Sequence, residues 1–417
     1  MLRDLANIPS DAGLTAQQPL HERAMTGKVT TRVMTSVSEV EEMRAIWSGW
    51  QQHPNSDMDL YLHTLRSRPQ FLRPHVIVVY RDGCPEALVV GRLELKKVEV
   101  KLGYASLLRK KTRALTFLYG GLLGTLSPEG SEAAVRDITN SLSLGDADLA
   151  YFNYLKTNSP LYRAAIKMPG ILCRDHVPHS QTHRGMRLPG SVDEFHLGLS
   201  PKARKNVKWQ AKRIIRDYSG NVSVRCFREK WDLDRMIQDV EGIARKTYQR
   251  GLGVGFTDNP EMHQRLSLEA EKGWLRGYVL YLQNAPSAFW IGTVYLGTFH
   301  SDYMGYDPTL GKYSPGMFLA VKVIEELCNG SDSGGQIYKI DFGLGDAQYK
   351  EVLGDLEWSD ASLYIFAPSF KGIGLNVVRT SVAILERVAR RTLEESGLLG
   401  KVKKMWRLRT IATGCQT

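Results

Sequence analysis

The sequence predicts an α/β protein of the α+β type, built from two tandem copies of one unit. Its 417 residues exceed the length at which a single hydrophobic core usually stops growing, so two domains are expected. Two stretches with the same pattern of apolar runs, turns and small residues occur, one in each half of the chain. The same order of further motifs then follows each stretch.

The two matching stretches are His75–Leu95 and Gly277–Leu296. Each contains an apolar run, a polar turn, and then Pro-x-Ala followed by three apolar residues and Gly. Their β-branched and aromatic content, interrupted by a short turn, predicts an antiparallel strand pair in each half.

Downstream of each pair the sequence indicates a strand, a loop with Ser-Pro, a helix, another strand and a tyrosine-bearing segment. Ser127 and Ser314 of the two loops are 187 positions apart, and so are Tyr162 and Tyr349. This common interval favours a duplicated unit. Chance similarity between α/β segments remains the alternative, and the first half carries an extra basic segment at residues 94–111.

The composition is that of a soluble globular protein, with 43% apolar and 24% charged residues. The five cysteines are scattered without a CxxC pair, so we expect no disulfide framework or zinc site and a reducing, cytoplasmic location. Residues 1–29 lack the apolar core of a signal peptide and are expected to form a flexible leader. The apolar run Ala114–Leu126 is too short to span a membrane.

The net charge of +11 is concentrated in two places, the segment Lys202–Arg216 and the C-terminal tail. The first is a predicted helix, with Ser200 as its N-cap, Pro201 in its first turn and Gly220 at its end. Its basic residues recur every three or four positions and share one face. That face is either simply solvated or a phosphate-binding surface. Its members are Lys202, Lys205, Lys208, Lys212 and Arg216.

The segment Lys339–Lys350 reads KIDFGLGDAQYK and contains the DFG triplet of protein kinases. A kinase also needs an HRD catalytic loop upstream, and none lies between Lys322 and Asp341. The alternation instead predicts a short buried strand that ends at Gly343. Asp341 then lies near the carboxyl end of a strand, where α/β proteins place ligands.

Four blocks in the second half resemble one family. GYDP (Gly305–Pro308), YSPG (Tyr313–Gly316), DFGLGDAQYK and the basic helix after Ser200 are similar to motifs of the CelD-like GNAT N-acetyltransferases, which are related to the tandem-GNAT FemABX transferases. The resemblance covers about Arg184–Ala367 and is faint before it. It implies two tandem GNAT-like mixed-sheet domains, the first degenerate, and transfer of an acyl group from a coenzyme A thioester to an amine.

The resemblance also implies a donor site in the second half, without a metal. The strand before Asp307 would polarise the thioester carbonyl through its backbone amides. The following loop would present its N–H groups to the pyrophosphate of acetyl-CoA at a helix N-terminus. Two acids, Glu129 and Glu132, occupy the equivalent loop of the first half and would repel phosphate. The residues expected to contact the coenzyme are Tyr306, Gly311, Lys312, Tyr313, Ser314 and Gly316.

Two catalytic residues are expected. Tyr349 matches the family tyrosine that protonates the departing thiolate, although it could equally be a packing residue. Asp341 could accept the proton of the amine, or it could cap a helix or pair with Lys350. Asp307 and Lys350 are expected to contact the acceptor, with turn formation and a surface ion pair as their structural alternatives.

The histidines do not suggest a second site. His75, His179, His183, His263 and His300 are far apart in sequence and lack HExxH or HxH spacing, so metal binding is not expected.

The expected organisation is a leader (1–29), a degenerate GNAT-like domain (30–185), a GNAT acyltransferase domain (186–370) and a basic amphipathic tail (371–417). The tail could pack on the protein or contact acidic lipid at a membrane surface. The acceptor suggested by the resemblance is an amine-bearing or sugar-linked molecule of polysaccharide or cell-envelope metabolism. Two alternatives remain, which are aminoacyl transfer from tRNA and an inactive binding subunit of a polysaccharide-synthesis assembly.

Overall fold

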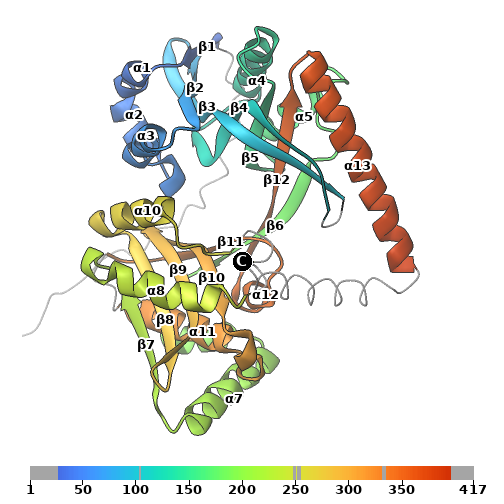
Figure 1. The fold of residues 1–417 in the computed structure, drawn as a ribbon. Coiled ribbons are helices and arrows are strands. Elements are labelled where there is room, and N and C mark those ends of the chain that lie inside the picture. The colour runs from blue at the N-terminus through green and yellow to red at the C-terminus, as the bar shows by residue number, and fades with distance from the viewer. Residues whose placement is uncertain (1–26, 103–104, 248–249, 251–254, 331–334, 396–417) are drawn as a thin grey trace, which may run out of the picture.

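One mixed sheet runs through both halves of the chain (Figure 1). The computed structural model describes residues 27–102, 105–247, 250, 255–330 and 335–395. Within these residues the sheet has 12 strands in the order β1-β2-β3-β4-β5-β12-β6-β11-β10-β9-β8-β7. The strands are β1 (Val29–Met34), β2 (Phe71–Arg81), β3 (Cys84–Leu102), β4 (Ala105–Gly124), β5 (Leu149–Lys156), β6 (His179–Arg187), β7 (Val222–Phe227), β8 (Leu275–Leu282), β9 (Ala285–Tyr295), β10 (Thr298–Tyr306), β11 (Lys339–Leu344) and β12 (Leu356–Phe366).

The helices pack on both faces of this sheet (Figure 1). Those of the first half are α1 (Val37–Glu42), α2 (Arg44–Trp50), η1 (Pro54–Ser56), α3 (Met58–Ser67), α4 (Pro128–Ser143) and α5 (Pro160–Lys167). Those that follow are α6 (Val192–Gly198), α7 (Pro201–Asp217), η2 (Lys230–Asp232), α8 (Leu233–Ala244), α10 (Pro260–Glu271), η3 (Pro308–Tyr313), α11 (Pro315–Cys328), α12 (Gln348–Leu353) and α13 (Phe370–Glu395).

The predicted duplication is present in the structure. The hairpins β2–β3 and β8–β9 turn at Asp82-Gly83 and Gln283-Asn284, and all four of these residues have a positive φ. Such paired positive φ angles match the twist of the strands that a two-residue hairpin joins. Both hairpins also shift register at the residue opposite the proline, where Tyr80 faces Pro85 and Tyr281 faces Pro286.

The later motifs occupy equivalent positions as well. Helices α4 and α11 begin at the prolines that follow Ser127 and Ser314, and Tyr162 and Tyr349 lie in α5 and α12. The basic segment that distinguishes the first half extends the β3–β4 pair. The predicted fold class, two tandem α/β units with a mixed sheet, is therefore confirmed.

The two units exchange their last strands. β6 follows the helices of the first unit but pairs with β11 of the second, whereas β12 follows α12 but pairs with β5 of the first. β6 and β12 also pair with each other, so they form the centre of the sheet (Figure 1). The predicted domain boundary between residues 185 and 186 falls inside β6.

The hydrophobic core of each unit contains side chains of the strand that it receives from the other unit. Leu363 and Ile365 of β12 are fully buried in the core of the first unit, between the sheet, α4 and α5. Met186 of β6 belongs to the core under α11 of the second unit. Each core therefore contains side chains from the sequence of the other half.

α13, the described part of the predicted tail, packs on the first half (Figure 1). Asn376 donates to the carbonyls of Leu172 and Arg174, and Arg379 pairs with the buried Asp175 at 2.5 Å. The outer side of α13 exposes an apolar stripe made of Val377, Val378, Ile384, Leu385 and Val388. The basic end of the tail (396–417) and most of the leader lie outside the described residues.

Truncating Leu363 tests the strand exchange. Leu363→Ala should lower the free energy of unfolding by about 3 kcal/mol, because it leaves a cavity in a close-packed core. Chemical denaturation measures this loss, and hydrogen exchange should show faster exchange in β5 of the first unit than in β11. Leu197→Ala on α6, where the side chain is 69% exposed, is the matched control and should change stability by less than about 0.5 kcal/mol. Unchanged protection of β5 would contradict the exchange.

Candidate functional site

Two parallel strands separate in the middle of the second unit. β10 and β11 pair only from Thr298 to His300 on β10 and from Lys339 to Asp341 on β11. Beyond His300, β10 continues to Tyr306 and pairs with β9 alone. β11 turns away at Gly343, which has a φ of +73° and follows a bulge against β6. Within the described residues, β10 and β11 are therefore not paired beyond His300 and Asp341.

A helix N-terminus lies where β10 ends. η3 follows β10, and Ser314 adopts a left-handed conformation with φ of 52° before α11 starts at Pro315. The Ser314 side chain makes no capping hydrogen bond to α11. The amides in the first turn of a helix have no acceptor within that helix and form a site of partial positive charge. An anion such as a phosphate is the natural partner of such amides.

The residues predicted to contact coenzyme A lie on this loop. Tyr306 is 42% exposed, and its ring lies next to Gly316, where an added Cβ would approach Tyr306 Cδ1 to 3.3 Å. Gly311 and Lys312 are exposed and Ser314 is partly exposed, but Tyr313 is buried beneath the loop. Tyr313 therefore supports the loop from below.

The equivalent helix of the first half has a closed N-terminus. Ser127 Oγ accepts a hydrogen bond from the Gly130 amide of α4 at 3.0 Å, and Glu86 accepts from the Ser127 amide at 2.8 Å. Glu129 lies in the first turn of α4 and pairs with Arg81. The anion-binding amides of α4 are thus already engaged by the protein, and the adjacent carboxylates oppose a phosphate. Of these two equivalent helices, α11 is the one whose N-terminus has no side-chain cap.

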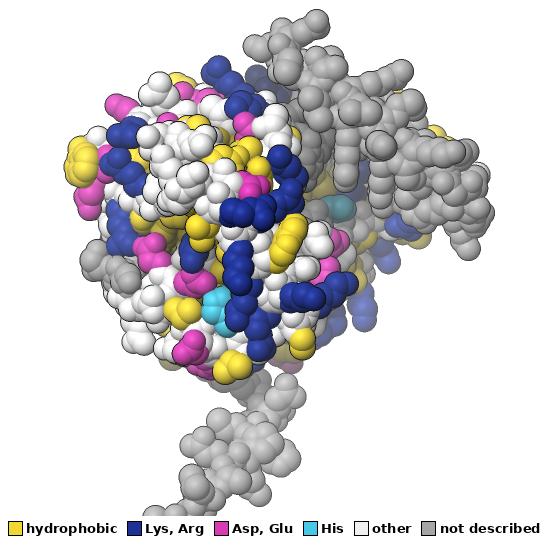
Figure 2. Space-filling model, turned by 90° about the horizontal axis from the view of Figure 1, so that it is seen from below, with side chains coloured by type: hydrophobic (Ala, Val, Ile, Leu, Met, Phe, Trp, Pro, Cys, Tyr) yellow, Lys and Arg dark blue, Asp and Glu magenta, His cyan; other side chains and the backbone are white. Residues whose placement is uncertain are grey.

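Helix α7 brings positive charge to the same loop. Arg213 donates to the Lys312 carbonyl at 3.1 Å and lies over the rings of Trp209 and Tyr313. The predicted basic face is present and exposed, and Ser200 caps α7 by accepting from the Ala203 amide. Figure 2, which views the side where α7 lies, shows Lys and Arg side chains as a band across this face.

On the opposite face of the sheet, histidines and aspartates gather at the point where β10 and β11 part. Phe299, Ile340 and Phe342 point into the core under α11. His300 and Asp341, which alternate with them, therefore point to the other face. Asp341 Oδ2 lies 3.7 Å from His300 Nδ1.

Asp341 also joins a third residue, His183 of β6. The Nε2 of His183 donates to Asp341 Oδ1 at 2.5 Å, and its Nδ1 donates to Asp360 Oδ2 of β12 at 2.8 Å. The indole of Trp358 stacks on the His183 ring with the centroids 4.2 Å apart. The two exchanged strands thus bring His183 and Asp360 to the site of the second unit.

The first unit supplies the remaining members of this cluster. His53, just before η1, packs its ring against His300 with the centroids 4.6 Å apart. Tyr119 of β4 lies against His53, and its hydroxyl is 3.3 Å from His183 Nδ1. We call His53, Tyr119, His183, His300, Asp341 and Asp360 the junction cluster, since both halves contribute to it.

The charges of the junction cluster are set by burial and by mutual contacts. Burial alone would lower the pKa of His183, but its hydrogen bonds with Asp341 and Asp360 raise it above its ordinary value. Burial alone would raise the pKa of Asp341, but contacts with His183 and His300 hold it well below its usual range. Burial, followed by the nearby His300, lowers the pKa of His53 well below its ordinary value. Asp341 is thus a carboxylate, and His53 is neutral.

Sequence reasoning identified one member of this cluster, Asp341, and dismissed the histidines because they are far apart in sequence. His183 and His300 are in fact neighbours of Asp341, because β6 and β10 flank β11 in the sheet. No local spacing signals this arrangement. Within the described residues, no group of three or more His, Cys, Asp or Glu side chains is placed to hold a metal ion.

The other predicted site residues have structural contacts of their own. Tyr349 lies on the α11 side of the sheet, against Phe342 and Trp290, with its hydroxyl bonded to Ser301. Burial raises its pKa. Asp307 caps η3 by accepting from the Thr309 amide at 3.0 Å and pairs with Lys246 at 2.7 Å. Asp307 thus fixes the start of the donor loop.

Lys350 is buried rather than paired at the surface. It is 8% exposed, and its ammonium group donates to the Leu344 carbonyl at 2.6 Å. Burial lowers its pKa to about 8, against the opposing charges of Asp341 and Asp346. Lys350 therefore anchors the turn after β11 near the junction cluster.

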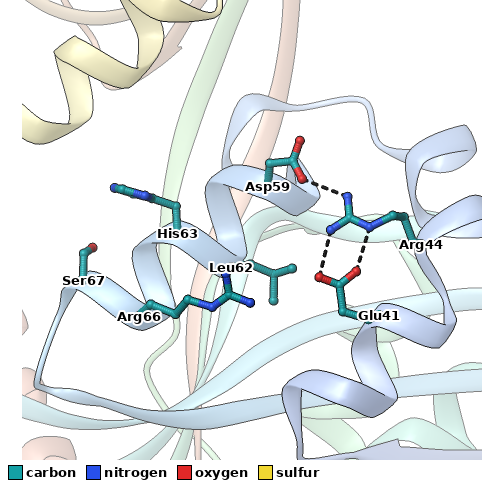
Figure 3. Close-up of a pocket in the computed structure, with 7 residues that line it drawn as sticks. All are labelled: Glu41, Arg44, Asp59, Leu62, His63, Arg66 and Ser67. Carbon is teal, nitrogen blue, oxygen red and sulfur yellow. Dashed lines mark hydrogen bonds and ion pairs between the residues drawn. The ribbon is translucent and has the colours of Figure 1, made fainter.

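Two cavities border helix α3. One of about 220 Å³ is bounded by α3, β4 and α10, and Tyr119 of the junction cluster is part of its wall. Polar groups such as Asn55, Thr64, Asn153 and Gln264 line it together with three arginines. The other, of about 360 Å³, lies over α1 to α3, where Arg44 bridges Glu41 and Asp59 (Figure 3). Three polar groups of that second cavity, Glu41, Arg44 and Asp59, thus bind one another.

The separated strands β10 and β11 and the N-terminus of α11 lie within one stretch of the sequence that matches a known domain family. The family model described as "Acetyltransferase (GNAT) domain" matches residues 201–351, so the predicted GNAT domain in the second half is confirmed. No curated protein matches the sequence significantly. Among the described residues, no helix is long and apolar enough to cross a membrane.

Several solved structures are similar in fold at low identity. FemX is 10% identical, with a TM-score of 0.48, and the match covers 80% of this chain and 96% of FemX. A tandem GNAT protein from the clavulanic acid biosynthesis pathway is 11% identical, with a TM-score of 0.47 and coverage of 82% and 99%. A probable N-acyltransferase from Enterococcus faecalis is 10% identical, with a TM-score of 0.38 and coverage of 82% and 73%.

The buried Lys350 should make stability depend on pH. Its pKa in the folded protein, about 8, is lower than the ordinary value of 10.5, so between these values the unfolded chain binds more protons. Stability must therefore rise as the pH increases through this window. Relative to Lys350→Met, the wild type should gain about 2 to 3 kcal/mol between pH 7 and pH 10. Denaturant titration of both proteins measures this, and a constant difference would contradict it.

Proposed function

We propose that the second unit transfers an acyl group, most simply acetyl, from acyl-CoA to an amine. The observation that carries this proposal is the open N-terminus of α11 beside the separated strands β10 and β11, within the residues that match the GNAT family. The first unit has the same topology, but its corresponding helix is closed by Ser127 and flanked by acids. One donor site per chain follows from this difference.

The donor would bind along the loop and into the gap between the strands. The first-turn amides of α11, with Lys312 and the cations of α7 nearby, would hold the phosphates of coenzyme A. The thioester would then reach β10 beyond His300, where backbone amides of the strand would stabilise the negative charge that develops on the carbonyl oxygen. These groups are fixed by the sheet before the donor arrives, so they need not reorganise during the reaction.

Tyr349 is placed to assist the leaving thiolate, because it lies on the α11 side of the gap and contacts Ser301 of β10. Its raised pKa makes complete proton transfer to a thiolate unfavourable. We therefore propose that the Tyr349 hydroxyl donates a hydrogen bond to the departing sulfur. Asp341, whose pKa is lowered, is a weak base and would act by orienting its histidine neighbours.

The acceptor would approach from the other face, where the first unit lies. The cavity next to Tyr119 offers hydroxyl, amide and guanidinium groups that suit a hydroxylated molecule. An amino sugar or a sugar-linked amine therefore fits, in line with the resemblance to CelD-like proteins of polysaccharide metabolism. We place the reaction in the cytoplasm, and the apolar stripe of α13 would allow contact with a membrane surface.

Aminoacyl transfer from tRNA is the second candidate, because the exposed basic face of α7 would also suit RNA. A catalytically inactive binding subunit is the third. Filter binding of charged tRNA and calorimetry with acetyl-CoA separate these three possibilities. Binding of tRNA without acetyl-CoA would favour the second, and binding of neither would favour the third.

Reversing the charge of the donor loop tests the proposal directly. Lys312→Glu imitates the acidic loop of the first unit and should weaken acetyl-CoA binding about tenfold, since it replaces attraction of the phosphates by repulsion. Calorimetry at low salt measures the Kd. Lys167→Glu makes the same charge change at the exposed end of α5 and should leave the Kd within twofold. Equal effects of both substitutions would contradict the proposed donor site.

A further inference from the structure

One histidine of the junction cluster, His300, is buried without a hydrogen bond to its ring within the described residues. His300 is 8% exposed, and neither of its ring nitrogens has a hydrogen-bond partner among the described residues. A buried polar group without a partner is costly, so a ligand that forms a hydrogen bond with His300 would offset this cost. His300 lies on the last paired residue of β10, directly before the gap between β10 and β11.

The other members of the cluster are not available to accept a proton. His183 uses both ring nitrogens to bind carboxylates. Asp341 accepts from His183 and from the Gly343 amide, the latter at 2.8 Å. His53 accepts the Asn55 amide on Nδ1. His300 alone combines a free nitrogen with an orienting carboxylate, at 3.7 Å from its Nδ1.

We propose that His300 is the proton acceptor for the amine, and that Asp341 and His53 position its ring. This proposal rests on the proposed acyl transfer. It also means that both units contribute to the active site. His53 comes from the first unit. His183, which binds Asp341, and Asp360, which binds His183, come from the exchanged strands. The first unit is then part of the catalytic site rather than an inactive copy.

His300 Nε2 takes a proton from the ammonium form of the acceptor, and the freed lone pair forms a bond to the thioester carbonyl carbon. The C–S bond breaks, and the sulfur leaves with the electron pair as coenzyme A thiolate. The new amide nitrogen loses its second proton to solvent, and the thiolate is protonated in turn. This proton transfer requires that the base, His300, and the nucleophile, the acceptor amine, lie within hydrogen-bond distance of each other.

The faces of the sheet support this assignment. The donor loop and Tyr349 belong to the α11 side, whereas His300 points to the side of the first unit and of the polar cavity beside Tyr119. Donor and acceptor thus approach the gap from opposite faces and meet at it. The charged or titratable groups around His300 and His53 include Asp341, His183, Tyr119 and Arg265 of α10.

Replacing His300 tests this proposal, with glucosamine as the probe amine and acetyl-CoA as the donor. In His300→Gln we expect kcat for coenzyme A release to fall at least 100-fold at pH 7, while the calorimetric Kd for acetyl-CoA stays within twofold. The residual rate should then climb about tenfold per pH unit below the pKa of the amine, since only the free amine can react. Asp341→Asn should lower kcat by a smaller factor, also without changing the Kd.

His75→Gln is the matched control, because His75 is fully buried in the first unit and its ring nitrogens also lack partners among the described residues. The His75→Gln variant should have a kcat within twofold of the wild-type value. A rate of His300→Gln within threefold of wild type, or equal losses in both variants, would overturn the proposal. So would acetyl-CoA binding by the wild type without any glucosamine-dependent thiol release. Failure of the wild type to bind acetyl-CoA would instead refute the proposed function itself.

Discussion

The hydrogen bonding of β6 to β12 is the constraint on which the rest of the structure depends. Every strand at the edge of a sheet has unpaired backbone groups, and an isolated unit would leave β5 or β11 with such an edge. Here each unit covers the open edge of the other with its own last strand, and the two exchanged strands then pair along seven residues. The result is one sheet whose two cores cannot be separated without breaking both.

This exchange also determines where chemistry is possible. His183 on β6 and Asp360 on β12 belong by sequence to different units, yet they form a hydrogen bond with each other. Asp341 is held from both sides, by His183 and by the turn at Gly343, and it faces the His300 ring. Because these groups are buried away from water, their electrostatic interactions are stronger, and the Asp341 carboxylate holds the neighbouring imidazole rings in place.

The two copies keep the same fold, but the N-termini of their equivalent helices differ. Ser127 and Ser314 occupy the same position before equivalent helices, but only Ser127 has an extended backbone that lets its side chain cap the helix. Ser314 is left-handed, so its hydroxyl does not reach the first-turn amides. The difference between a structural helix and a candidate anion site thus arises from the backbone conformation of a single residue.

Much of this fold could be predicted from local patterns. The polar turns at Asp82-Gly83 and Gln283-Asn284, the Ser-Pro loops and the caps of α7 all depend on neighbouring residues, and the structure contains them. The strand exchange could not be predicted, since β6 and β12 have ordinary strand sequences and nothing local specifies their partners. His300 and His183 were missed for the same reason, because tertiary pairing alone brings them to Asp341. The burial of Tyr313 under its loop also depends on tertiary packing, and its predicted contact with the coenzyme stays a prediction.

The central claim is that one donor site forms where β10 and β11 separate, and none forms in the first unit. Hydrogen exchange with and without saturating acetyl-CoA tests this most directly, because it reports protection along the described chain. We predict slower exchange in the first turn of α11 and in Ser301–Tyr306 of β10, with no change in the first turn of α4. Protection of both helices, or of neither, would contradict the claim.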